Sequence, residues 1–265
     1  MKLRSTLDQE GGVIPKGCTW LRAAAASFQP DNNMLTLEDG RTVAYNRLIV
    51  CPGLQLDWDK IEGLTDTLGR NGVCSNYSKD TVEYTWTCIQ SLSGGTALFT
   101  QPPMPIKCAG APQKIAYLAS DYWRKQGTLN RTNVDFCMTG DALFGVAYYR
   151  PGLQEAVDYY GINVLYKHTL VAVNGPEHKA TFAVTGPDGK VTNVVKEFDM
   201  LHVTPPQSAP DFIKKSPLAN EGGWLDVDPS TLQHAKYPSI FGMGDVIGTS
   251  NAKTMAAARA QTPVV

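Results

Sequence analysis

The sequence predicts an α/β fold in which short buried strands alternate with helices, so that the strands form a parallel sheet. Two observations support this prediction. First, three apolar runs in the middle of the chain are separated by helical patterns, and these runs lie at residues 97–100, 134–137 and 162–166. Second, a hairpin with an Asp-Gly turn, a buried strand and then proline occur near the start of the chain and again around residues 186–206. This repeat suggests a duplicated nucleotide-binding architecture.

Length and composition limit the class of protein. With 265 residues, 43% of them apolar, and a formal net charge of −1, the chain can bury a core and is long enough for two interleaved domains. The balanced charge implies no nucleic-acid partner. Residues 1–12 lack an apolar core and carry acidic residues, so no signal or transit peptide is visible. No apolar run approaches the ~18 residues of a membrane span.

The six cysteines argue against a metal centre. They form no CxxC pair, and no histidine stands at ligand spacing, so neither a zinc site nor a thioredoxin-type motif is expected. A reducing compartment fits this pattern best. Cys137, at a strand end, and His202, in a buried strand, are both interpreted as core residues and not as catalytic groups.

The first section of the chain predicts strands and a turn open to a ligand. After a strand that follows Trp20, residues 35–46 form a hairpin that turns at Asp39 and Gly40. Residues 48–50 form a buried strand that ends at Pro52 and Gly53. These two residues permit a tight turn where a ligand can approach the backbone.

Three helices are predicted in the middle section. Ser78 is the expected N-cap of the first, whose buried face carries Val82, Trp86 and Ile89. The second has Pro112 in its first turn, ends at Gly127, and has apolar positions at helical spacing, namely Ile115, Leu118, Ala119 and Tyr122. The third spans residues 151–160 and ends at Gly161. Two tyrosine pairs are expected to pack it against the sheet: Tyr148 with Tyr149, and Tyr159 with Tyr160.

Cys108 lies in the turn that opens the second of these helices. The unpaired N–H groups of the first helical turn and the charge of Lys107 both favour a thiolate, so Cys108 is a candidate nucleophile. A packed, inert thiol is the alternative that the residues alone leave open.

The last section predicts a second ligand-facing edge. Residues 240–243 form a strand, Gly244 leaves room for a ligand, and Asp245 places a carboxylate at the strand's end. The helix at residues 254–261 directs its N-terminus at the same point. Such a carboxylate suits a ligand hydroxyl, and the helix N–H groups suit a pyrophosphate or a flavin carbonyl. The alternative is that Asp245 only caps a helix.

Five stretches together match one family: KCAGAPQK at residues 107–114, SNYS at 75–78, LHVTPP at 201–206, LQHAKYPSIFGMGD at 232–245 and AKT at 252–254. On these residues the chain resembles the sulfide:quinone oxidoreductases of the type shared by mitochondria and many bacteria, which are flavoproteins with two dinucleotide-binding domains. The matches span almost the whole chain, and KCAGAPQK is far more specific than a generic glycine pattern.

The resemblance implies tandem Rossmann-like dinucleotide-binding domains, the FAD/NAD(P)-binding fold, truncated at both ends. Residues 1–75 would form part of the FAD-binding domain, residues 76–203 an inserted NAD-like α/β domain, and residues 204–265 the return to the FAD-binding domain. The implied enzyme is a FAD-dependent sulfide:quinone oxidoreductase. It oxidises hydrogen sulfide to sulfane sulfur through a cysteine persulfide and passes the electrons through FAD to a membrane quinone.

Carried over residue by residue, the resemblance assigns Cys108 as the first of the family's two redox cysteines. Asp245 is similar to the carboxylate that contacts the ribityl chain of FAD. Further expected cofactor contacts are Ala25 near the adenine end, Pro52 and Gly53 in the turn, and Lys253, Thr254, Met255 and Ala256 along the flavin.

Two departures from the family pattern indicate an internal fragment whose own activity stays open. No strand and GxGxxG loop precede the first residue, and the region with the second redox cysteine and the membrane-binding helices would follow Val265. The expected partners are sulfide, a sulfane acceptor and a quinone. We expect peripheral contact, through that C-terminal region, with the inner face of a bacterial plasma membrane or of the mitochondrial inner membrane. This chain carries no targeting signal.

Two other functions stay open. An NAD(P)H:quinone oxidoreductase has the same architecture, although here prolines and Cys108 stand where NADH binding favours a glycine-rich turn. The second is a non-catalytic fragment that keeps the fold, and the yellow colour of bound flavin would distinguish it from the enzyme.

Overall fold

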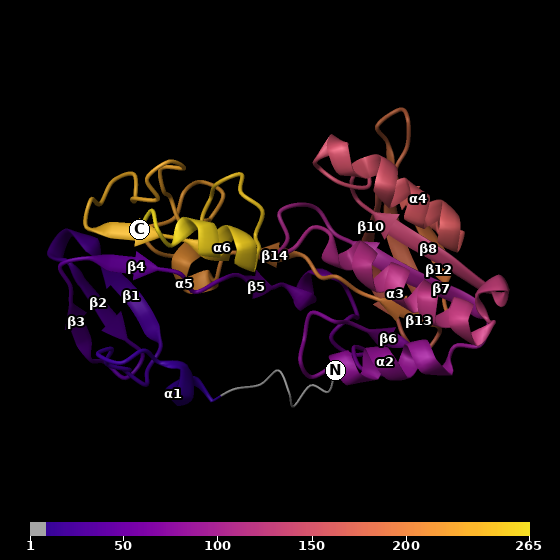
Figure 1. The fold of residues 1–265 in the computed structure, drawn as a ribbon, viewed down its shortest axis with the longest axis horizontal. Coiled ribbons are helices and arrows are strands. Elements are labelled where there is room, and N and C mark those ends of the chain that lie inside the picture. Colours follow the sequence, from indigo (N-terminus) through magenta and orange to yellow (C-terminus); the bar gives the residue numbers. More distant parts are fainter. Residues whose placement is uncertain (1–8) are drawn as a thin grey trace. The chain divides into compact units, whose positions relative to one another are not determined.

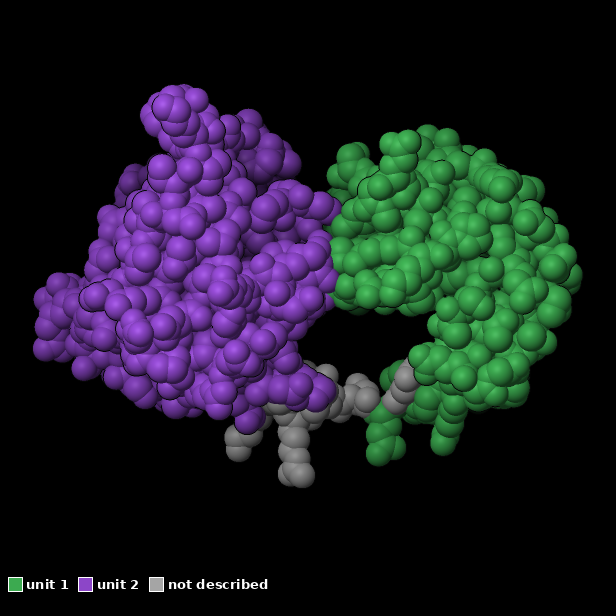
Figure 2. Space-filling model, turned by 180° about the vertical axis from the view of Figure 1, so that it is seen from behind, with its two compact units in different colours: residues 1–55, 208–265 green, residues 56–207 purple. Residues whose placement is uncertain are grey.

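The computed structural model describes residues 9–265, which fold into two compact units. Unit 1 comprises the chain up to Gln55 together with Ser208–Val265, and unit 2 comprises Leu56–Gln207, as coloured in Figure 2. The predicted domain boundaries at residues 75 and 203 therefore differ from the unit boundaries, most at the first crossing. The prediction of no leader peptide concerns residues 1–12, and residues 1–8 lie outside the described part of the chain.

Unit 2 is built on a five-stranded sheet with the order β6-β13-β7-β8-β9 (Figure 1). All four strand pairs are parallel, which confirms the predicted parallel sheet. The carboxyl ends of the five strands therefore lie at one edge. The strands are β6 Val73–Cys74, β7 Gly95–Gln101, β8 Thr132–Met138, β9 Asn163–Tyr166 and β13 Met200–His202.

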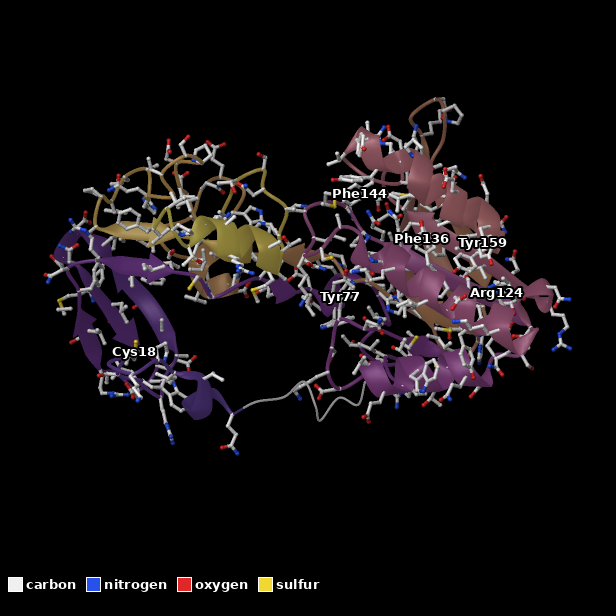
Figure 3. The ribbon with its side chains drawn as sticks, in the orientation of Figure 1. Cys18, Tyr77, Arg124, Phe136, Phe144 and Tyr159 are labelled. Atoms are coloured by element: carbon white, nitrogen blue, oxygen red, sulfur yellow. The ribbon has the colours of Figure 1, made fainter. Side chains whose placement is uncertain are left out.

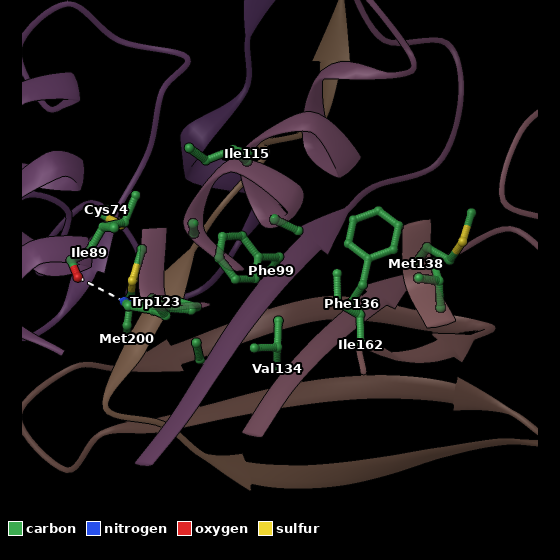
Figure 4. Close-up of a cluster of buried hydrophobic side chains, with 14 of the residues drawn as sticks. Cys74, Ile89, Phe99, Ile115, Trp123, Val134, Phe136, Met138, Ile162 and Met200 are labelled. Atoms are coloured by element: carbon green, nitrogen blue, oxygen red, sulfur yellow. Dashed lines mark hydrogen bonds between the residues drawn. The ribbon is translucent and has the colours of Figure 1, made fainter. Parts of the chain in front are cut away.

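Three helices cover one face of this sheet: α2 Val82–Ser91, α3 Ala111–Gln126 and α4 Arg150–Tyr160. Phe99 and Met200 point from the sheet toward them and pack with Trp123 of α3 (Figure 4). The indole N–H of Trp123 donates to the carbonyl of Ile89 in α2 at 2.8 Å, and the bond joins the two helices. Helices α3 and α4 end at Gly127 and Gly161 in the left-handed conformation, as predicted.

A three-stranded antiparallel sheet covers the other face: β10 His168–Asn174, β11 Lys179–Thr185 and β12 Val191–Glu197. Leu98 and Leu201 point toward it, because neighbouring residues of a strand face opposite sides of the sheet. Phe182 of β11 is fully buried against them. Unit 2 is thus a layer of helices, a parallel sheet and an antiparallel sheet.

The start of helix α2 differs from the prediction. Ser78 is not the N-cap; its hydroxyl accepts the N–H of Asp80 at 3.2 Å in the preceding turn, and the helix begins at Val82. The buried face carries Thr85 and Ile89, whereas Trp86 is 48% exposed. The prediction that Trp86 lies on the buried face was therefore wrong, because Thr85 and Ile89 occupy the side of the helix that is turned to the core.

Other predicted packing residues are also exposed. Leu118 of α3 is 61% exposed, because Trp123 and Ala119 occupy the face turned to the sheet. The prediction that both tyrosine pairs pack α4 against the sheet is wrong for three of the four residues, since the exposed fractions are 85% for Tyr148, 57% for Tyr149 and 64% for Tyr159. Val157 is the buried residue of α4.

Unit 1 contains two small sheets. The antiparallel sheet β1-β2-β3 consists of Ala25–Gln29, Met34–Leu37 and Thr42–Ala44, and its hairpin turns at Asp39 and Gly40 as predicted. The parallel pair consists of β4 Leu48–Val50 and β15 Ile240–Gly242. The short pair β5 Gln55–Leu56 and β14 Gln207–Ser208 lies where the chain crosses between the units. The helices are α1 Glu10–Val13, α5 Asp211–Lys214 and α6 Met255–Gln261.

The core of unit 1 gathers Val50, Ile240, Leu225, Leu218 and Ile213. The strand at residues 48–50, predicted to be buried, is buried on one side only: Val50 is 5% exposed and Ile49 is 52% exposed. The physical reason is that alternate residues face opposite sides of a strand, and the described core covers one of them. Within the described residues, no helix is long and apolar enough to cross a membrane.

Candidate redox and cofactor sites

Cys108 lies in the loop that leaves the carboxyl end of β7 and leads into helix α3. The carboxyl edge of a parallel sheet is where ligands bind in such folds. The Cys108 backbone has a φ of 51°, and its carbonyl accepts the N–H of Ala111 at 2.7 Å. The side chain is partly exposed. A non-glycine residue in the left-handed region is strained, and strain of this kind clusters at functional sites.

Tyr77 is the aromatic neighbour of this loop, and Figure 3 labels it. Its ring lies 5.7 Å from the ammonium of Lys107, a cation–π contact. Burial of the phenol, with a smaller contribution from negative charge on Cys108, raises the pKa of Tyr77, so this side chain stays neutral. Tyr77 was not predicted as a site residue, although the SNYS stretch contains it.

His202 and Cys137 occupy the core, in agreement with their interpretation from the sequence. His202 is fully buried at the end of β13, and its Nε2 accepts the N–H of Asn76 at 3.0 Å. Burial lowers the pKa of His202 to about 3, so the imidazole is neutral. Burial likewise raises the pKa of Cys137 to about 12, which keeps its thiol protonated. His202 is therefore a very weak base, and Cys137 lacks the thiolate that a nucleophile needs.

Unit 1 brings two of the predicted cofactor segments to one edge. Strands β4 and β15 are parallel with Val50 opposite Gly242, so the turn at Pro52 and Gly53 and the turn at Gly244 follow neighbouring strand ends. Gly53 has a φ of 78° and Gly244 a φ of 74°. A Cβ built on either glycine meets no atom within 4 Å, so the backbone there faces open space. A ligand can approach both turns closely.

Asp245 follows Gly244 in the single 3-10 turn Gly244–Val246. The alternative that Asp245 caps a helix is not what the structure shows, because the cap of α6 is Thr254, whose hydroxyl accepts the N–H of Ala257 at 3.2 Å. The Asp245 carboxylate is partly exposed, and no side chain of the described residues donates a hydrogen bond to it. Its oxygens are available to a ligand.

Lys253 holds the loop that carries Asp245. Its ammonium donates to the carbonyls of Asp245 at 2.7 Å and Ile247 at 2.9 Å, and lies 3.9 Å from the ring centroid of Trp224. The residue is 7% exposed, and burial lowers the pKa of its ammonium to about 8. The side chain therefore supports the loop from inside the unit.

The remaining predicted cofactor residues lie in helix α6 and in the antiparallel sheet of unit 1. Met255 is 84% exposed and Ala256 is exposed in the first turn of α6. Ala25 lies in the other sheet, opposite Leu37. Gln261 was not predicted as a site residue, yet its side-chain oxygen accepts the N–H of Gly244 at 2.8 Å. The sequence signal that could have indicated this role is that Gln261 is a single glutamine on the buried side of the alanine-rich helix α6.

Relatives among curated proteins match the chain from end to end. It is 43% identical over 265 residues to the mitochondrial sulfide:quinone oxidoreductase of Mus musculus, covering 100% of this chain and 58% of that protein. The protein of the same name from Dictyostelium discoideum is 40% identical over 258 residues, covering 97% of this chain and 56% of that one. The chain thus spans little more than half the length of these relatives. No family model matches it.

Solved structures agree on the fold. A chain of the mitochondrial ATP synthase assembly of Tetrahymena thermophila superimposes with a TM-score of 0.72 at 24% identity, covering 92% of this chain and 60% of that chain. The sulfide:quinone oxidoreductase of Aquifex aeolicus gives a TM-score of 0.71 at 17% identity, covering 88% of this chain and 55% of that chain. NDH2 from Plasmodium falciparum gives 0.60 at 13% identity, covering 86% of this chain and 50% of that one. The predicted α/β fold class is confirmed, since the chain shares the fold of these oxidoreductases.

Proposed function

We propose, on the premise that this chain belongs to the sulfide:quinone oxidoreductase family, that the complete protein oxidises hydrogen sulfide and reduces a quinone. The observation that carries the proposal is the KCAGAPQK segment. It places the partly exposed Cys108 in a strained turn at the carboxyl edge of the unit 2 sheet. End-to-end identity of 43% to the mouse enzyme supports the same reaction for this protein.

Cys108 is the proposed redox thiol. Hydrosulfide attacks the Cys108 sulfur of a disulfide between Cys108 and the family's second redox cysteine. The S–S bond of the disulfide breaks, Cys108 becomes a persulfide, and the second cysteine leaves as a thiolate. The balance is that HS⁻ loses two electrons and one proton to give one sulfane sulfur, while a quinone gains two electrons and two protons to give a quinol. A small sulfane acceptor then removes the outer sulfur from the persulfide and frees the thiolate. Once the outer sulfur of the persulfide has been removed, the two thiolates re-form the disulfide and give up the electron pair.

FAD is the proposed cofactor, and the residues at the unit 1 edge fit it. Gly53 and Gly244 leave open space beside the strand ends. Asp245 offers a carboxylate to which no side chain of the described residues donates a hydrogen bond. We assign Asp245 to a ribityl hydroxyl, Ala25 to the adenine end, Pro52 and Gly53 to the turn beside the cofactor, and Lys253, Thr254, Met255 and Ala256 to the flavin segment. When bound, FAD accepts the electron pair from sulfide and passes it to the quinone.

A quinone acceptor requires that the complete protein contacts a membrane. Since quinones dissolve in the lipid phase, the complete protein must reach a membrane surface, and the named relatives are mitochondrial. We propose peripheral attachment to the mitochondrial inner membrane or to the corresponding bacterial plasma membrane.

The alternative of an NAD(P)H:quinone oxidoreductase gains no support from the loop between β7 and α3. This loop carries Pro102, Pro103 and Pro105, and Gly110 is its only glycine. A dinucleotide pyrophosphate needs several glycines at this point, because the backbone must approach it closely.

The experiment that tests the cofactor assignment compares Asp245→Ala with Asp226→Ala in the complete protein. Both carboxylates are partly exposed in unit 1, but only Asp245 lies at the strand edge. We expect about tenfold weaker FAD binding for Asp245→Ala, the loss of a charged hydrogen bond. Flavin absorbance after dialysis measures it. Equal flavin content in both variants would contradict the assignment, and colourless parent protein would favour the non-catalytic alternative.

A further inference from the structure

Lys107, the residue before Cys108, has both of its main-chain polar groups engaged by side chains from distant parts of the sequence. Its N–H donates to Oε1 of Gln207 at 2.7 Å. Its carbonyl accepts the Tyr77 hydroxyl at 3.5 Å. Gln207, in β14, is 8% exposed, and Tyr77 lies between β6 and α2. The peptide groups on both sides of the Lys107 Cα are therefore held by elements other than the loop itself.

Tyr77 is in turn fixed to the sheet. Its N–H donates to the hydroxyl of Ser75 at 3.1 Å, and that hydroxyl donates to the carbonyl of Val203 at 2.7 Å. Ser75 is fully buried. The Tyr77 ring also lies beneath the Lys107 ammonium, at 5.7 Å. This chain of contacts connects the Cys108 loop to the end of β13.

Cys108 needs such support. Its φ of 51° places it in the left-handed region, where a side chain with a Cβ is unfavourable and persists only when the surroundings determine it. On the far side, the Cys108 carbonyl accepts the Ala111 N–H at 2.7 Å. The hydrogen bonds from Tyr77 and to Gln207 restrain the two peptide groups of Lys107, and so restrain the backbone on the N-terminal side of Cys108.

We infer that Tyr77 and Gln207 are positioning residues that hold Lys107 and so keep Cys108 in its left-handed conformation for the reaction with sulfide. This inference rests on the proposed role of Cys108 as the redox thiol. Neither side chain is given a chemical step. Their contribution is to fix the direction in which the thiol points, which sets the rate of the chemical step and leaves sulfide binding unchanged.

The test uses four variants of the complete FAD-loaded protein. Tyr77→Phe removes the hydroxyl and keeps the ring. Gln207→Leu removes the acceptor, whereas Gln207→Glu keeps an oxygen that can accept the Lys107 N–H. Tyr84→Phe is the matched control, because its hydroxyl also bonds a main-chain group in unit 2, accepting the N–H of Gly72 at 3.1 Å.

Two measurements are made on each variant. The first is amide hydrogen exchange of residues 102–110, which reports opening of the loop independently of activity. The second is the rate of flavin reduction as a function of sulfide concentration, which separates the limiting rate from the half-saturating concentration. For Gln207→Leu we expect about fivefold faster exchange, the equivalent of one lost hydrogen bond, and about a tenfold lower limiting rate at an unchanged half-saturating concentration.

Tyr77→Phe should change both quantities in the same direction by less, while Gln207→Glu and Tyr84→Phe should match the parent. Unchanged exchange in Gln207→Leu and Tyr77→Phe would overturn the inference, and so would faster exchange with a parental limiting rate. A failure of the proposed function is seen separately: a Cys108→Ser protein that sulfide still reduces would remove the redox role, while the exchange data would still report whether the loop is held.

Discussion

Lys253 illustrates how one buried charge organises the proposed flavin edge. Its ammonium bonds two carbonyls of the loop that carries Asp245 and lies against Trp224. The two hydrogen bonds require the charged ammonium, whereas burial disfavours the charge. Burial has the larger effect, since the pKa of Lys253 falls from 10.5 to about 8. The loop is therefore held by a group whose charge is lost at mildly alkaline pH.

The pH dependence of stability follows from this shift. Between pH 8 and 10.5 the unfolded chain holds the Lys253 proton and the folded chain has released it, so the free energy of unfolding rises with pH across this window. Relative to Lys253→Met, we expect the parent to gain stability from pH 8 to 10, measured by urea unfolding followed by circular dichroism. A parent-minus-variant difference that stays constant would contradict the depressed pKa.

Two cysteines of unit 2 should differ in reactivity. A hydrogen bond from the Cys74 thiol, aided by Tyr84, lowers the pKa of the partly exposed Cys88, whereas burial raises that of Cys137 to about 12. At pH 8 we expect iodoacetamide to label Cys88 at least about tenfold faster than Cys137, because the thiolate is the reacting form. Peptide mass spectrometry measures both. Comparable rates in the folded protein would show that Cys137 is not packed as described.

At the scale of elements, the contact between α2 and α3 depends on Trp123. This indole is fully buried and its N–H bonds the Ile89 carbonyl, as the dashed line in Figure 4 shows. Trp86 of α2 is 48% exposed and makes an edge contact with Tyr122, with ring centroids 5.0 Å apart. The two tryptophans therefore provide a matched pair.

Trp123→Phe should lower the free energy of unfolding by about 2–3 kcal/mol, since it leaves a void and an unpaired carbonyl. Trp86→Phe should change it by no more than about 0.5 kcal/mol, as expected at an exposed position. Urea unfolding followed by circular dichroism measures both variants. Equal losses would mean that α2 and α3 are not joined by this bond.

The same two helices show where sequence reasoning about elements succeeds and stops. Pro112 and Gly127 mark α3 through local backbone preferences, and the structure agrees. Ser78 failed as a cap because its hydroxyl accepts a hydrogen bond in an earlier turn, and Trp86, which was predicted on the buried face, is exposed. Local signals locate a helix to within a few residues, whereas the face that it buries depends on contacts with elements distant in the sequence, here with α3.

At the scale of the whole molecule, the fold class and many of the strands were predictable, whereas the short strand β6 and the strand order were not. Strand β13 inserts between β6 and β7, and this placement depends on pairing between residues more than a hundred positions apart. The candidate site follows the same division. Cys108, Gly244 and Asp245 stand in recognisable segments, while Tyr77, Gln207 and Gln261 act through long-range hydrogen bonds.

The most direct test of the central claim is the rate at which sulfide reduces the flavin of the complete protein, followed by the loss of flavin absorbance in a stopped-flow instrument. We expect rapid reduction of the parent and of Cys18→Ser, a control at an exposed thiol. Cys108→Ser should retain the flavin spectrum and be reduced at least about a thousandfold more slowly, since a hydroxyl is a far poorer nucleophile and carries no sulfane sulfur. Reduction of Cys108→Ser at the parental rate would contradict the account.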